Sequence, residues 1–425
     1  MGVRLSYEAR PYFSLHQAQM QPACYVHPTS AADVSSILKL SDAPCEFQFA
    51  VRCGGHMPWP GSSNVDAPGF TIDMEAFNDI VYDEATERVT FGAGLRWGDV
   101  YTYLGGYNRT MRGGRTMDVG VAGFLLGGGV GFPGDSFSSA TVADYEVVLS
   151  SGAIVHANES DNADLFWALK YGSTNFGIVT RITMETTLDD DVWGGVQVFA
   201  MDSPGADAVL DELVELSSKL EDGMKEWLCV LMSNEGPSAI ALRVAHADVP
   251  LPTIANPIVN NLNNTPGLKK SDVWKAWAAQ DGVMKGEYHK WMTLTLKPDA
   301  RFVRRIFDKG MELYSGKAGT WNIGFQPLPG HLFADGQPIL LALFVFDSYS
   351  PDNHMRDLVD WVSTHTEMVK PFIYMNYASG DQDAYKGMDL QRYWDVKEKY
   401  DPENLLGKHW SGGFKLPHFI QHDEL

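Results

Sequence analysis

Positively charged side chains are scarce in this 425-residue chain. Lys and Arg together number 33, against 54 Asp and Glu, which gives a formal net charge of -21. Proteins that bind nucleic acid concentrate Lys and Arg on one face, because the phosphate backbone supplies much of the affinity. This chain has no such cluster, so we expect no nucleic-acid partner. A small uncharged or cationic ligand is favoured instead.

Long apolar runs are also absent. No run approaches the roughly 18 residues that a membrane-spanning helix needs, and residues 1–23 lack the basic start and apolar centre of a secretory signal peptide. We therefore expect a soluble protein with no membrane span. The chain ends in His422-Asp423-Glu424-Leu425, which is a signal for retention in the endoplasmic reticulum once a chain has entered the lumen. The expected location is the endoplasmic reticulum lumen or secretory pathway if that signal is used, and otherwise the cytoplasm.

Cysteine is rare. The four cysteines, Cys24, Cys45, Cys53 and Cys229, have no metal-ligand spacing and are too few for a disulfide framework. We therefore expect no metal site, and at most one disulfide bridge.

Glycine, in contrast, is abundant and gathers in two stretches, Cys53–Ser63 and Met111–Gly134. The first follows Phe47, Phe49 and Val51, whose alternation with polar residues predicts a β-strand. Glycine-rich loops expose consecutive backbone N–H groups that hold phosphate oxygens, so two such loops suit the pyrophosphate of a dinucleotide. Two tight turns in a compact domain explain the glycines equally well. A nicotinamide-binding fold is disfavoured, because Gly92–Gly98 has the wrong spacing for G-x-G-x-x-G.

The length of the expected strands and helices changes near residue 191. Residues 1–190 alternate short strands with short helices, whereas longer strands flanked by helices follow, which predicts an α+β layer with one helical cover. After Lys370 the chain becomes irregular and aromatic. We expect three segments: residues 1–190, residues 191–369, and residues 370–425.

Several motifs in order resemble the FAD-linked oxidases of the vanillyl alcohol oxidase and p-cresol methylhydroxylase superfamily, particularly the fungal form of the berberine bridge enzyme-like branch. They include "VRCGGHMPWPGSSN", "GAGLRWGDVY", "DVGVAGFLLGGG", "YMNYA" and "KYDPENLL". The resemblance implies a two-part FAD-binding domain, residues 1–190 and 370–425. Inserted into it would be a substrate-binding domain, residues 191–369, made of an antiparallel sheet covered by helices.

The resemblance also implies the flavin site. His56 matches the histidine that binds the 8α carbon of the flavin covalently, although most isolated histidines are surface or structural residues. Thr116 stands where many members have a second linking cysteine, so a single covalent bond is expected. Val121 matches a position associated with oxygen access in oxidases; an ordinary core valine is the alternative. The implied cofactor-binding residues are Arg52, Cys53, Gly54, Gly55, His56, Met57, Gly61, Ser62, Thr116, Val119, Gly120, Val121, Gly123, Gly127, Gly128, Gly177, Ile178 and Val179.

Tyr374, Asn376 and Tyr377 match the segment that brings polar groups to the flavin and substrate, and are the implied catalytic residues. Tyr374 is the candidate base, or aligns the substrate, provided that neighbouring charge lowers its pKa from about 10. Aromatic packing is the alternative for these residues. Gln326 and Trp410 are weaker pocket candidates.

The function implied is oxidation of a C–H bond in a small alcohol, sugar, amine or phenolic metabolite, with hydride passing to FAD and O2 giving H2O2. One alternative is a cyclase or isomerase that keeps FAD without net redox change, as the altered loop from Val130 to Tyr145 allows. A second alternative is a binding protein on the same fold. The sequence specifies neither the substrate nor the oligomeric state.

Overall fold

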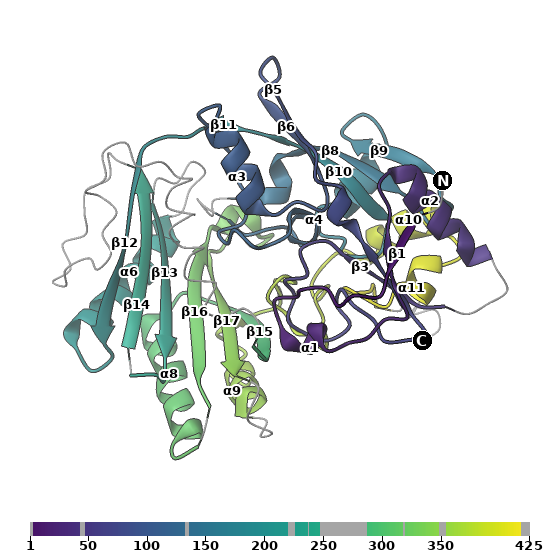
Figure 1. The fold of residues 1–425 in the computed structure, drawn as a ribbon. Coiled ribbons are helices and arrows are strands. Elements are labelled where there is room, and N and C mark those ends of the chain that lie inside the picture. Colours follow the sequence, from purple (N-terminus) through teal and green to yellow (C-terminus); the bar gives the residue numbers. More distant parts are fainter. Residues whose placement is uncertain are drawn as a thin grey trace, which may run out of the picture.

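The computed structural model describes residues 3–42, 47–131, 136–219, 226–236, 238–246, 287–317, 319–347 and 354–417. Cys45 and the terminal tetrapeptide His422–Leu425 lie outside these ranges. Two parts stand side by side, an N-terminal part with two main sheets and a larger sheet backed by helices (Figure 1). None of the described helices is both long and apolar enough to cross a membrane.

The first sheet has four strands in the order β1-β2-β4-β3. β2 and β3 pair parallel with β4, whereas β1 pairs antiparallel with β2. Its strands are β1 (Arg4–Ser6), β2 (Tyr25–His27), β3 (Phe49–Arg52) and β4 (Phe70–Asp73). The short helix α1 (Leu15–Ala18) precedes β2, and α2 (Ala31–Leu38) follows it with Ser30 as its N-cap. β3 delivers the chain directly into the first glycine loop, as the alternating pattern predicts.

The second sheet is antiparallel, with the order β5-β6-β10-β8-β9. It comprises β5 (Ile80–Asp83), β6 (Arg88–Gly92), β8 (Val142–Val148), β9 (Ile154–Asn158) and β10 (Ile178–Glu185). Helices α3 (Trp97–Gly105), α4 (Val121–Leu126) and α5 (Ala163–Leu169) occur in this part, and β7 (Arg109–Thr110) pairs with β11 (Thr187–Leu188). The chain returns here at its C-terminal end, where α10 (Leu390–Tyr400) contacts α5 and is followed by α11 (Leu405–His409).

The third sheet is antiparallel throughout, with the order β12-β14-β13-β16-β17-β15-β18. Its strands are β12 (Val192–Ala200), β13 (Glu226–Ser233), β14 (Ser238–His246), β15 (His289–Leu296), β16 (Trp321–Leu328), β17 (Ile339–Asp347) and β18 (Val369–Lys370). This confirms the expected α+β fold. The limits of the three segments as domains stay a prediction.

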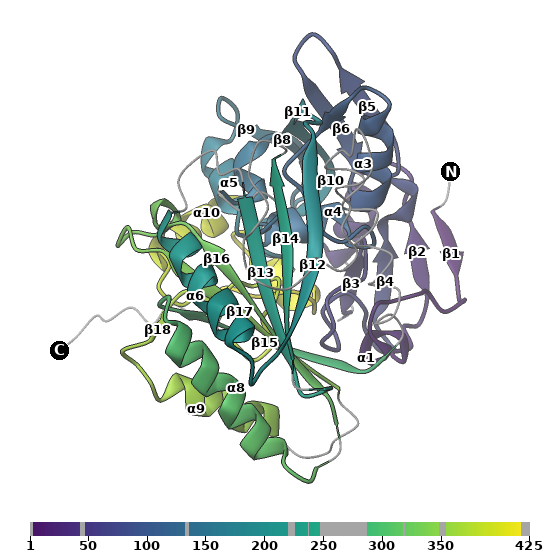
Figure 2. The same cartoon turned by 90° about the vertical axis from the view of Figure 1, so that its left-hand side faces the viewer.

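Helices cover one face of the large sheet. α6 (Pro204–Lys219), α8 (Ala300–Tyr314) and α9 (His354–Ser363) lie side by side in front of it when it is viewed from outside (Figure 2). α8 buries Phe302, Val303 and Ile306 at helical spacing. The opposite face of the sheet turns toward the N-terminal part (Figure 1). This arrangement places the functional cavity between the two parts.

Candidate functional site

A cavity of about 710 Å3 lies between the glycine loops and the inner face of the large sheet. Because side chains alternate across a strand, every second residue of a strand reaches this face. Accordingly, Cys229 and Leu231 of β13 line the cavity, as do Leu341, Leu343 and Val345 of β17. The wall on the other side is built from residues around His56, Gly120 and Tyr374. Segments far apart in the sequence therefore line the same cavity.

The two glycine loops touch each other at Gly54 and Gly120. A Cβ atom added to Gly54 would lie 2.3 Å from the backbone N of Gly120, and one added to Gly120 would lie 2.4 Å from the N of Gly54. Arg96 joins the loops as well, since its guanidinium donates to Gly54 O at 2.9 Å and also to Asp118 O. Only glycine at both positions permits this approach, so the glycines serve more than turn formation.

Gly54→Ala tests this close packing. The added methyl group forces the loops apart, and overpacking of this kind costs about 1–3 kcal/mol. We expect a loss of that size in the free energy of unfolding, together with weaker flavin retention, in denaturant titrations and absorbance spectra. Gly105→Ala is the matched control, because nothing lies within 4 Å of a Cβ there. Equal stability and flavin content of the two variants would contradict the role of the contact.

His56 lines the cavity on the loop that follows β3. Its ring stacks on Phe13, with centroids 4.0 Å apart and an interplanar angle of 17°, and lies 6.0 Å from the ring of Trp291. Aromatic packing on one face holds the imidazole in a fixed orientation. The histidine is therefore positioned by neighbours from both parts of the chain.

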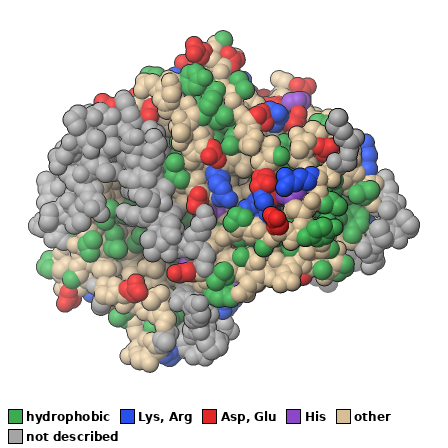
Figure 3. All heavy atoms as spheres, in the orientation of Figure 1, with side chains coloured by type: hydrophobic (Ala, Val, Ile, Leu, Met, Phe, Trp, Pro, Cys, Tyr) green, Lys and Arg blue, Asp and Glu red, His purple; other side chains and the backbone are tan. Residues whose placement is uncertain are grey.

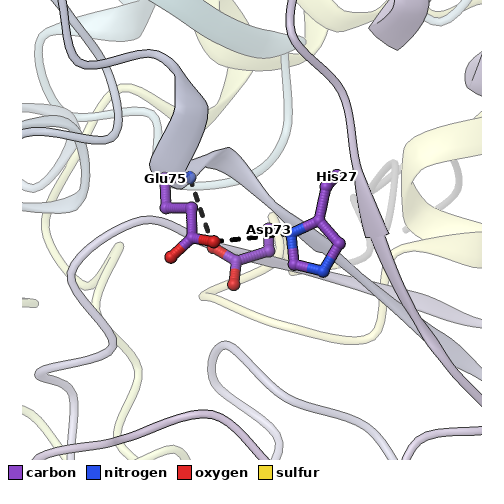
Figure 4. Close-up of side chains that lie close together, drawn as sticks. All are labelled: His27, Asp73 and Glu75. Atoms are coloured by element: carbon purple, nitrogen blue, oxygen red, sulfur yellow. Dashed lines mark hydrogen bonds and ion pairs between the residues drawn. The ribbon is translucent and has the colours of Figure 1, made fainter. Parts of the chain in front are cut away.

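His27 is a buried histidine, but it does not line the cavity. It lies beside Asp73 and Glu75, whose ligand atoms come within 4.8 Å of its ring nitrogens and of one another (Figure 4). Nε2 of His27 is 2.7 Å from Ser6 Oγ, and burial lowers its pKa. Arg10 pairs with both carboxylates and Arg52 pairs with Asp73, so a metal ion would have to displace guanidinium groups.

Most of the proposed cofactor-binding residues come together at the cavity wall: Cys53, Gly54, Gly55, His56, Met57, Ser62, Thr116, Val119, Gly120, Gly123, Gly127, Ile178 and Val179. Five are not among its lining residues: Arg52, Gly61, Val121, Gly128 and Gly177.

For two of these five residues, the structure shows why they do not line the cavity. The Arg52 guanidinium donates to Asp73 and, at 2.7 Å, to Pro11 O, so it braces the end of β3 instead of facing the cavity. Val121 begins α4 and is 0% exposed within the core. Its neighbours Ala122 and Gly123 line the cavity in its place.

The three proposed catalytic residues, Tyr374, Asn376 and Tyr377, all line the cavity. Tyr374 Oη accepts hydrogen bonds from Val130 N at 2.7 Å and from Asn376 Nδ2 at 3.1 Å. Burial raises the pKa of Tyr374, so the lowered value that a base at this position requires is not found. The hydrogen bonds make Tyr374 a positioning residue for Val130 and Asn376.

Tyr377 has a different environment. The half-buried Arg115 donates to its hydroxyl through the guanidinium, and Gln326 Oε1 lies 3.5 Å from the same oxygen. Arg115 also lies over the Trp227 ring, 5.1 Å from its centroid. Burial acts to lower the pKa of Arg115, but Tyr377, Cys229 and Tyr374 outweigh it, so the pKa is raised. A guanidinium beside a hydroxyl oxygen stabilises negative charge that develops on that oxygen.

Four buried donors in the cavity wall need acceptors. The indole N–H groups of Trp59, Trp291 and Trp410 and the amide nitrogen of Gln326 find none within the part of the chain that the structure describes. Buried donors are nearly always hydrogen-bonded in native proteins. FAD carries phosphate, hydroxyl and ring carbonyl oxygens, so the residues present fit this cofactor.

Sequence reasoning overlooked Arg96 and Arg115. Both lie in glycine-rich stretches, "GAGLRWG" and "RGGRT", and a cation within such a stretch is the signal that could have identified them. Trp59 and Trp291 were overlooked as well, and Trp291 has no local motif around it.

Comparisons with known proteins agree with this geometry. A family model for an FAD binding domain matches residues 22–158. The chain is 37% identical over 459 residues to the FAD-dependent monooxygenase FUP4 of Fusarium proliferatum (strain ET1), covering 95% of this chain and 87% of that relative.

Two solved structures show the same fold. 6-Hydroxy-D-nicotine oxidase from Arthrobacter nicotinovorans matches with a TM-score of 0.77 at 20% identity, covering 98% of both chains. Glucooligosaccharide oxidase from Acremonium strictum matches with a TM-score of 0.76 at 18% identity, covering 95% of both chains. These identities establish the fold alone, whereas the match to the Fusarium protein establishes the family. The chain therefore belongs to the family of FAD-dependent oxidoreductases that includes the Fusarium protein, with FAD as its cofactor.

Proposed function

We propose that this enzyme is an oxidase of apolar hydroxylated molecules, with FAD bonded to His56 and with Tyr377 as the base. The observation that carries the proposal is the pairing of Tyr377 with Arg115 in the cavity that His56 lines. The cavity therefore holds both a group able to take up a proton, Tyr377, and the expected attachment point of the flavin, His56.

The substrate class follows from the cavity wall. Apolar side chains of the large sheet dominate that side, notably Trp227, Leu231, Leu242 and Leu343. Among the described lining residues there is no Asp or Glu, so a cationic amine would lack a counter-ion. Arg115 instead favours a hydroxyl group that becomes negative as it loses its proton. We therefore propose a largely apolar alcohol, phenol or enol as substrate.

FAD held by the glycine loops and His56 would supply the redox chemistry: the substrate carbon would lose a hydride to it, and O2 would take up those two electrons and two protons and leave as H2O2. The protein supplies orientation and proton transfer. Tyr377 accepts the proton of the substrate hydroxyl, and Arg115 stabilises the phenolate beforehand. Tyr374 holds Asn376 and the Val130 amide, while the leucines of the sheet exclude water. Positioned bases of this kind contribute about 10²–10⁴-fold to a rate.

The number of covalent bonds follows from Thr116. The glucooligosaccharide oxidase of Acremonium strictum carries a 6-S-cysteinyl, 8α-N1-histidyl FAD. In this chain Thr116 lines the cavity and has no thiol, and Cys53 of the first glycine loop is held protonated because burial raises the pKa of its thiol to about 12. We therefore propose a single bond, through His56.

Labelled oxygen tests the reaction type, because the Fusarium relative is named a monooxygenase. An oxidase releases one H2O2 for each substrate oxidised and leaves no atom of 18O2 in the product. Peroxidase-coupled detection and product mass spectrometry measure both quantities with a panel of phenols, alcohols and amines. Incorporation of one 18O atom into the product, together with a requirement for a nicotinamide reductant, would contradict the oxidase proposal and show that the enzyme is a monooxygenase. Turnover without O2 uptake would instead favour the cyclase alternative.

A further inference from the structure

A second cavity, of about 620 Å3, lies beside the flavin cavity. Gly128 and Phe372 line the second cavity, whereas Gly127, Val130 and Tyr374 line the first. Two chain segments, residues 127–130 and 372–375, therefore form the wall between them. Tyr171 secures this wall, since its hydroxyl donates to Ile373 O at 2.7 Å and accepts from Met375 N at 3.0 Å.

Aromatic rings make up much of the second cavity. The rings of Phe137 and Phe372 are 6.0 Å apart, and those of Tyr171 and Phe372 are 5.9 Å apart. Phe333 meets Phe372 edge to face at 5.4 Å. On the other side, Trp167 and Tyr393 lie 4.6 Å from each other. A space bounded by several ring faces and edges accepts a flat ring system, which packs on them in stacked or edge-on geometry.

The charge of this cavity is opposite to that of the whole chain. Its described lining residues include three lysines, Lys170, Lys370 and Lys386, but one acidic residue, Asp335, which pairs with Lys370. Lys170 and Lys386 have no carboxylate within ion-pair distance in the described ranges. A surplus of positive charge is unexpected in a chain with a net charge of -21. On the face seen in Figure 3, basic and acidic side chains are interspersed.

Lys170 is the most informative of the lysines. It is partly buried, at the end of α5, and its ammonium lies 4.1 Å from the centroid of the Phe166 ring. Burial lowers its pKa, with Glu159 and Glu185 acting in the opposite direction. Removing an ammonium from water without a close anion is unfavourable, and an anion bound in the cavity would offset that cost.

We propose that the second cavity is a binding site for a small aromatic carboxylate, distinct from the flavin site. The aromatic walls would hold the ring system, and Lys170 and Lys386 would bind the carboxylate. The site uses none of the redox chemistry and stands independently of the proposed function. Tyr171 belongs to the site and holds the backbone on both sides of Tyr374, so the two cavities share one wall.

Calorimetric titration of the flavin-loaded protein with 2-naphthoate tests the proposal. We expect one binding site, and 2-naphthamide, which has the same rings without the charge, should bind at least about tenfold more weakly. The double substitution Lys170→Gln and Lys386→Gln should weaken naphthoate binding at least about tenfold. Lys309→Gln, on α8 where Lys309 pairs with Glu312, is the control and should leave it unchanged.

Three results would overturn the proposal. The first is the absence of naphthoate binding to the folded wild-type protein. The second is equal naphthoate affinity in the wild-type protein and the double variant. The third is binding that Arg115→Gln abolishes and the double variant retains, because that pattern places naphthoate in the flavin cavity. Each result is independent of whether the enzyme proves to be an oxidase.

Discussion

Tyr377→Phe is expected to lower kcat by about 10²–10⁴-fold, the range typical of a positioned general base. The variant keeps the ring that packs edge to face on Tyr374, at 4.8 Å, and on Trp291, at 6.3 Å, so folding and flavin content should be retained. Only the oxygen that Arg115 contacts is lost. Stopped-flow measurement of flavin reduction isolates this step from the reaction with O2.

Arg115→Gln removes the guanidinium that contacts the proposed base, Tyr377. Without the guanidinium the phenolate of Tyr377 is less stable, so the pH at which kcat rises should move upward, with activity partly recovered in alkaline buffer. Tyr385→Phe is the control, because Tyr385 is buried but its hydroxyl donates to Gly172 O away from the cavity. A Tyr377→Phe enzyme with wild-type flavin reduction would exclude Tyr377 as the base.

His56→Ala is expected to abolish covalent flavin binding completely. After precipitation with acid, the wild-type pellet should remain yellow, whereas the variant pellet should be colourless and its FAD should appear in the supernatant. The variant should still bind FAD reversibly, because the two glycine loops and the buried donors of Trp59 and Trp410 remain in place. Its turnover should fall, since the covalent bond is expected to raise the potential of the flavin.

His27→Ala is the matched control for this experiment. Both histidines lie within the first 60 residues, but His27 contacts Ser6 and Glu75 outside the cavity. We expect its pellet to stay yellow. Loss of colour in His27→Ala but not in His56→Ala would reverse the assignment of the attachment site.

Local patterns predicted much of the fold. The hairpins β5-β6 and β8-β9 and the strands β13, β14, β15 and β17 follow from alternation and turn residues. β12 and β16 lack such a pattern, because Gly194 and Gly195 interrupt one and Gly324 and Pro327 interrupt the other, and these residue types are rare in strands. Pairing on both sides overrides that low propensity in β16, and β12, at the edge of the sheet, pairs with β14 along its whole length.

The site could be predicted only in part, because some of its residues are adjacent in the sequence and others meet only in the folded chain. The first glycine loop and His56 lie in one continuous stretch after β3, so the sequence displays them together. Arg115 and Tyr377 are 262 positions apart, and their contact depends on the returning C-terminal segment. The burial that raises the pKa of Tyr374 also arises from packing between distant segments, which no local motif encodes.

The bond between His56 and the flavin is the central claim, and peptide mass spectrometry measures it most directly. After digestion of the purified yellow protein, the peptide containing His56 should carry the mass of one FAD less two hydrogens, and fragmentation should place the addition on the imidazole. A flavin-bearing preparation in which this peptide is unmodified, or in which the flavin lies on another residue, would contradict the account.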